Sequence, residues 1–149
     1  MNQTLAEIVI LTFITLSAGL LGFISTVMQR VMEDMPAAEF KALISKLFTY
    51  SARDVLSILE SMVPFFGVIA YFIAYGFNHW WFIGGFAIWL IASTISKLWN
   101  VPIYGKVLST DAKDEAALTT LRLKLRRANM VRALLTGVAV ILILIQFAS

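Results

Sequence analysis

The sequences KLWNVP at residues 97–102 and RRANMVR at residues 126–132 decide the fold of this chain. One long apolar run ends in the first sequence, and another begins through the second. Eight of the twelve lysine and arginine residues lie between Lys97 and Arg132, these two included. Because basic residues gather at one surface of a membrane, the pattern predicts two membrane-crossing helices whose connection lies at that surface.

The composition of the whole chain agrees with this interpretation. It has 149 residues, of which 60% are hydrophobic and 14% charged, a balance typical of integral membrane proteins. A helical span needs about 20 apolar residues. Runs of that kind predict four spans, at about residues 8–28, 55–77, 80–98 and 128–147. We therefore expect a single domain with an all-α fold, an integral membrane four-helix bundle.

Two further helical features are predicted outside the spans. Between spans one and two, Pro36 suits the first turn of a short amphipathic helix. Its apolar stripe consists of Phe40, Leu43, Ile44, Leu47 and Phe48. This helix either lies at the membrane surface or covers a lipophilic site as a lid. The fourth helix is predicted from about Ala112 to Phe147, longer than a bilayer requires, so its first half is a cytoplasmic extension.

The positions of the basic residues predict an orientation. All twelve fall in the connections between spans one and two and between spans three and four, or at their borders. The positive-inside rule then places both connections in the cytoplasm and both termini outside. From the small size and this topology we expect a bacterial inner membrane. The same rule accounts for the basic run from Arg122 to Arg132, so no nucleic-acid partner is expected. Membrane lipids are the expected partners, with a homo-oligomer or a membrane complex as further alternatives.

The rarity of metal-binding side chains limits the chemistry. The chain contains no cysteine and one histidine, His79. These counts exclude a disulfide relay, an iron–sulfur cluster and a haem held by two histidines of one chain. We expect no metal and no cofactor, and we interpret His79 as a residue of the membrane boundary.

Two charged residues within the predicted spans form the candidate site. Glu60 and Arg132 lie at matching depth from the cytoplasmic surface, and charged residues in such positions often mark function. We predict that they pair and act as catalytic residues, with Asn100, Tyr104 and Asn129 as substrate-binding residues around them. The alternative is an ion pair that only fixes the helices in register.

Several short motifs resemble the anthrone-oxygenase-like family of small four-helix membrane proteins. They are Gly22-Phe23, Val27-Met28, Met35-Pro36-Ala37-Ala38-Glu39-Phe40, Asn100-Val101-Pro102 and Asn129-x-x-Arg132. The resemblance implies oxidation of a lipophilic aromatic substrate by molecular oxygen without a metal or flavin. It implies that Asn100, Asn129 and Arg132 matter to this reaction. In a site of that kind, Glu60 would act as base and Arg132 would stabilise the enolate. The chain departs from the family pattern at Gln29, Tyr104 and Leu125.

Two alternatives to an oxygenase stay open at this point. Glu60 followed by Pro64-Phe65-Phe66 is similar to the second helix of the membrane-associated eicosanoid and glutathione enzymes, which implies a transferase. The other alternative is a non-enzymatic accessory subunit or lipid-binding scaffold. An open cavity at Glu60 and Arg132 favours an enzyme, whereas a closed ion pair favours the scaffold.

Overall fold

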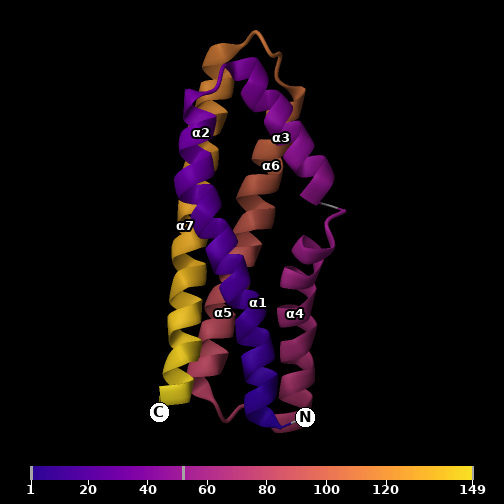
Figure 1. Ribbon diagram of the computed structural model, residues 1–149, viewed down its shortest axis with the longest axis vertical. Helices are drawn as coiled ribbons and strands as arrows, with labels where there is room; N and C mark the ends of the chain where they lie inside the picture. Colours follow the sequence, from indigo (N-terminus) through magenta and orange to yellow (C-terminus); the bar gives the residue numbers. More distant parts are fainter. Residues whose placement is uncertain (1, 52, 149) are drawn as a thin grey trace.

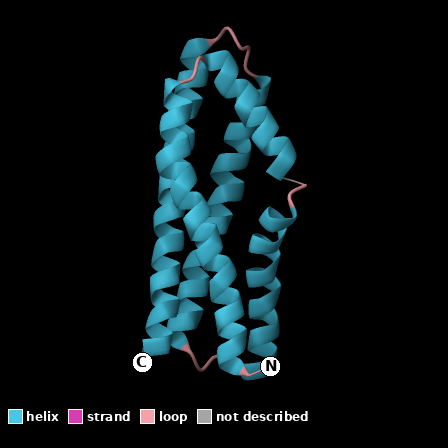
Figure 2. Ribbon diagram, viewed as in Figure 1, coloured by secondary structure: helices cyan, strands magenta, loops and turns pink. Residues whose placement is uncertain are grey.

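A computed structural model describes residues 2–51 and 53–148, which are helical apart from short connections, with no strand among them (Figures 1 and 2). The all-α prediction is confirmed for these residues. The helices are α1 (Gln3–Phe23), α2 (Gln29–Asp34), α3 (Ala37–Ser51), α4 (Val55–Tyr75), α5 (Trp80–Ile95), α6 (Val101–Ser109) and α7 (Glu115–Ala148). Single π-helical turns at Ile24–Met28 and Ser96–Asn100 join α1 to α2 and α5 to α6.

Within residues 2–51 and 53–148, four continuous helices are long and apolar enough to cross a membrane: Gln3–Asp34, Val55–Tyr75, Trp80–Ser109 and Glu115–Ala148. The first begins earlier than the predicted span, because the Asn2 side chain caps it by accepting a hydrogen bond from the Leu5 amide at 2.7 Å. The second ends earlier than residue 77, at Gly76, whose φ of 75° suits glycine. The predicted segment at residues 36–48 is helical, as α3.

The two π turns have local causes. Pro102 has no backbone N–H and its ring crowds the preceding turn, which is the turn that widens at Ser96–Asn100. At the other π turn, the Ser25 and Thr26 hydroxyls both donate to the Gly22 carbonyl, at 3.1 and 2.7 Å. Both turns pack against α7. Because π turns often accompany functional sites, they direct attention to this level of the molecule.

α7 is the helix against which most of the others pack. It lies along α5 and also contacts α1, whereas α4 packs extensively only against α1 among the described residues (Figure 1). α5 approaches α7 closely at Gly85, where an added Cβ would lie 2.7 Å from the Ala139 carbonyl oxygen. A Cβ on Gly84 would meet nothing within 4 Å. Of the Gly84-Gly85 pair in the sequence, only Gly85 is required by the packing.

The end of the molecule that contains α2, α3 and α6 has its own apolar core. Phe40 and Ile44 of α3 are buried there with Met32, Leu118 and Leu125. Leu47 and Phe48, also in the predicted apolar stripe, are 45% and 42% exposed. The stripe therefore contacts the rest of the protein mainly through its first half.

Arg122 fixes the connection between α2 and α3. Its guanidinium donates to the Glu33 and Met35 carbonyls, at 3.0 Å each, and stacks 4.6 Å from the centre of the Phe40 ring. Arg126, one turn further along α7, forms an ion pair with Glu33 at 3.1 Å. Two of the basic residues that the sequence assigns to orientation therefore hold the connection between α2 and α3 in place.

Candidate functional site

A cavity of about 410 Å³, here called the central cavity, lies where α4 faces α5. All four long helices contribute to it, because α4 packs against α1 and leaves its other side open towards α5. Its polar lining residues are Ser17, Glu60, Ser61, Ser93, Thr94, Ser96, Lys97 and Arg132, and its apolar ones include Phe65, Phe66 and Trp89. Its size and mixed lining are typical of small-molecule sites.

Glu60 reaches the central cavity from the second turn of α4. Asp54 caps this helix by accepting a hydrogen bond from the Ser57 amide at 2.7 Å. That backbone hydrogen bond holds the pKa of the Asp54 carboxyl below its usual value. Four residues after Glu60, Pro64 has no N–H to donate to the Glu60 carbonyl. The helix is therefore well anchored at its start and weakened at the turn that carries the acid.

Glu60 and Arg132 line the same cavity, but no hydrogen bond or ion pair joins them among the described residues. Glu60 Oε2 and Arg132 Nε are both buried without a hydrogen-bond partner. The predicted direct pair is therefore not formed, although the two side chains are brought to one place. Leaving buried polar atoms unpaired costs about 1–3 kcal/mol each, so a purely structural pair would be expected to close.

Lys97 adds a second cation to the central cavity, from the π turn before α6. The cavity thus contains one carboxyl group and two basic side chains, an arrangement that favours an anionic ligand. The aromatic side chains of Phe65, Phe66 and Trp89 offer flat apolar surface beside these charges. Glu60 also borders an outer groove of about 700 Å³ between α1 and α4.

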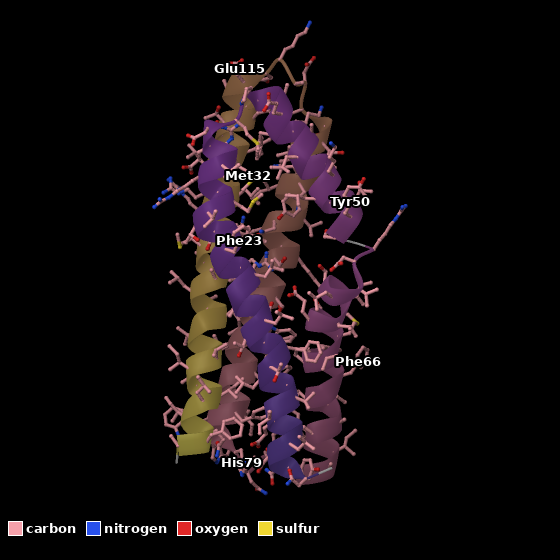
Figure 3. The ribbon with its side chains drawn as sticks, viewed as in Figure 1. Phe23, Met32, Tyr50, Phe66, His79 and Glu115 are labelled. Atoms are coloured by element: carbon pink, nitrogen blue, oxygen red, sulfur yellow. The ribbon has the colours of Figure 1, made fainter. Side chains whose placement is uncertain are left out.

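The predicted substrate-binding residues lie elsewhere. Asn100 Nδ2 donates to Asn129 Oδ1 at 2.6 Å, and both side chains are buried. Asn129 and Tyr104 line a separate cavity of about 340 Å³ beneath α3, here called the α3 cavity, where Phe23 and Met32 also lie (Figure 3). The single predicted site is therefore divided into two, and the binding roles of Asn100, Tyr104 and Asn129 stay predictions.

A buried cluster at the opposite end was missed by the sequence analysis. Glu7, only 1% exposed, accepts a hydrogen bond from the Tyr71 hydroxyl at 2.5 Å and contacts His79 Nδ1 at 2.5 Å. Gln3 Nε2 donates to the same hydroxyl at 2.8 Å. His79 lies at the end where α1 begins and α7 ends (Figures 1 and 3). These four residues are here called the end cluster.

A signal for the end cluster was present in the sequence. Glu7 precedes Ile10 and Ile14 by three and seven residues, so it continues the buried face of α1. The predicted first span begins at about residue 8, so it left Glu7 outside the helix and this periodicity was not recognised. Among the described residues, no three histidine or acidic side chains come close enough together to hold a metal ion.

Comparisons with protein families, with characterised proteins and with solved structures gave no match for this chain.

Proposed function

We propose that this chain is an integral membrane four-helix bundle of a bacterial inner membrane. The proposal is supported by four helices of sufficient length and apolar character. In the proposed orientation, the basic connections α2–α3–α4 and α6–α7 face the cytoplasm. The start of α1, the end of α7 and the α4–α5 connection lie together at the other end, which would face outwards (Figure 1).

We further propose that the central cavity binds an acidic, lipophilic aromatic molecule and deprotonates it. The observation that carries this proposal is that Glu60 and Arg132 face one cavity while each keeps a buried polar atom without a partner. Glu60 accepts the proton, and Arg132 stabilises the anion that forms. Lys97 adds to the positive potential, and the aromatic lining packs against the rings of the substrate.

The resemblance to anthrone oxygenases suggests the reaction that the deprotonated substrate undergoes. A methylene group beside an aryl ketone loses a proton to Glu60, and the resulting enolate gives two electrons to molecular oxygen. The peroxide formed at that carbon then loses water, so that the methylene becomes a carbonyl group. One methylene compound and one O₂ thus give one ketone and one water. Binding near Arg132 lowers the energy of the enolate, which is the species that reacts with oxygen.

The experiment compares bound molecules in the wild type, Glu60→Gln and Arg132→Gln, with Arg53→Gln as the exposed control. Organic extracts of each purified protein are examined by mass spectrometry, and an anthrone is then added under air. The wild type and the control are expected to retain an aromatic ketone and to produce the quinone. Arg132→Gln is expected to lose the bound compound, while Glu60→Gln binds it without oxidising it.

The substitutions test chemistry rather than folding, because no hydrogen bond joins Glu60 to Arg132 among the described residues. Unfolding temperatures of all four proteins are therefore expected to be similar. If all four carry only ordinary phospholipid and none oxidises the anthrone, the enzyme is excluded and a lipid-binding scaffold takes its place.

A further inference from the structure

The basic residues of α7 face three different directions. Arg122 and Arg126 contact the connection between α2 and α3, through the carbonyls of Glu33 and Met35 and the Glu33 carboxyl. Arg132 faces the central cavity. Lys124 and Arg127 line neither, and among the described residues no ion pair or side-chain hydrogen bond occupies them. A run that looks uniform in the sequence thus leaves two cations free on one face.

Lys124 and Arg127 border a groove of about 360 Å³ on the outside of α6 and α7, here called the basic groove. The two residues are three apart, so they lie one turn from each other on the same side of α7. The rest of the groove is apolar and consists of Leu98, Trp99, Pro102, Ile103 and Ala128. Within the part of the chain that the structure describes, no carboxyl side chain lines it.

The two halves of the basic groove suit the two parts of a lipid. Leu98 and Trp99 belong to the π turn and are 67% and 49% exposed, so the widened turn presents apolar surface outwards. Tryptophan prefers the boundary between headgroups and hydrocarbon. Lys124 and Arg127, which have no ion-pair partner in the part of the chain that the structure describes, lie beside this surface, where a headgroup phosphate would be.

We propose that the basic groove is a binding site for one anionic phospholipid. Its phosphate lies between Lys124 and Arg127, and an acyl chain lies along Leu98 and Ile103. A zwitterionic lipid binds less well, because its ammonium group meets two cations and no carboxylate. This site depends on the proposed insertion into a membrane, but not on the proposed chemistry of Glu60 and Arg132.

The test uses the full chain in lipid vesicles that contain spin-labelled phosphatidylglycerol or spin-labelled phosphatidylcholine. Electron paramagnetic resonance measures the immobilised fraction of each lipid, which gives their relative affinities. The wild type is compared with Lys124→Gln/Arg127→Gln and with Lys106→Gln/Lys113→Gln. Both double variants lose two positive charges, but Lys106 and Lys113 lie outside the groove.

The groove variant is expected to bind phosphatidylglycerol about 30-fold more weakly than the wild type, since each basic residue near anionic headgroups contributes about 1 kcal/mol. The control is expected to keep the wild-type preference. Brominated phosphatidylglycerol should quench part of the tryptophan fluorescence of the wild type. This quenching should be absent in Trp99→Phe. Equal losses in both double variants would indicate a diffuse charge effect and overturn the site. Failure of the protein to float with the vesicles would instead refute membrane insertion itself.

Discussion

Two acids of the long apolar helices, Glu7 and Glu60, differ in what surrounds them. Glu7 in the end cluster has both Tyr71 and His79 at 2.5 Å. Glu60 faces Arg132 and Lys97 across the central cavity, with one oxygen buried and unpartnered. A satisfied polar cluster stabilises helix packing, whereas an unsatisfied one keeps its binding capacity for a ligand.

The largest expected difference in the free energy of unfolding is between Glu7→Gln and Glu60→Gln. Glu7→Gln loses the hydrogen-bonding geometry of a buried carboxyl group that two side chains contact, so the free energy of unfolding should fall by about 3 kcal/mol. Glu60→Gln should leave the free energy of unfolding nearly unchanged, because the Glu60 carboxyl has a buried oxygen that already lacks a partner. Reversible unfolding in mixed detergent micelles measures both. The comparison fails if Glu60→Gln is the more destabilising of the two.

Gly85→Ala tests how closely the helices pack next to the end cluster. The new Cβ would lie 2.5 Å from Ile143 Cγ1 and 2.7 Å from the Ala139 carbonyl oxygen, so α5 must move away from α7. Overpacking of this kind should cost about 2 kcal/mol. Gly84→Ala, which meets nothing within 4 Å, is the matched control and should be neutral or slightly stabilising. Unfolding of both variants in the same mixed micelles measures the difference, and equal losses would show that α5 can shift freely.

Tyr71→Phe tests how much a single hydroxyl group of the end cluster contributes to stability. This hydroxyl donates to Glu7 and accepts from Gln3, so its removal leaves two partners unsatisfied and should cost about 1.5 kcal/mol. Tyr50→Phe is the control, because Tyr50 is 68% exposed. Thermal unfolding of the two variants in one detergent gives the difference. Equal stability of both would show that the end cluster contributes nothing measurable.

The sequence predicted which side chains of a helix face inwards better than it predicted which side chains of different helices make contact. In the last helix, steps of three and four residues predict an inward face that consists of Leu118, Leu121, Leu125, Asn129 and Arg132. The first four are buried, and Arg132 lines the central cavity. Periodicity along one helix cannot say how near a neighbouring helix lies, so the direct pairing of Glu60 with Arg132 was wrong. α4 packs extensively against α1 and not against α7, which leaves a cavity where contact was predicted.

Other features depend on which helices are neighbours. Asn100 and Asn129 do not line the central cavity with Glu60, because Asn100 bonds to Asn129, which lines the α3 cavity. Nothing in the Gly84-Gly85 pair says which glycine faces α7. The Glu7 contact with His79 joins residues 72 apart, at the meeting of two helix ends, so only the fold brings them together.

The smallest expected effect concerns Asp54, which caps the helix that carries Glu60. Its carboxyl accepts the Ser57 amide hydrogen bond, and this lowers its pKa below the ordinary value of 3.8. A lowered pKa in the folded state means that the contribution to stability is present above pH 3.8 and is lost as the pH falls through the folded-state pKa. The wild type should therefore lose a small amount of stability on acidification that Asp54→Asn does not lose. The effect is small because Asp54 is fully exposed and screened by water.

Asp54→Asn also distinguishes the role of Asp54 as the cap of α4 from the role of Glu60 in the central cavity. Asparagine keeps an oxygen that can accept the Ser57 amide hydrogen bond, so α4 and the central cavity should be preserved. Ligand binding to the central cavity should then equal that of the wild type, whereas Glu60→Gln lowers turnover. If Asp54→Asn lowers turnover as much as Glu60→Gln does, the acid that matters to the reaction lies at the start of α4 and not within the cavity. In that case the contrast between Glu7 and Glu60 no longer identifies the functional group.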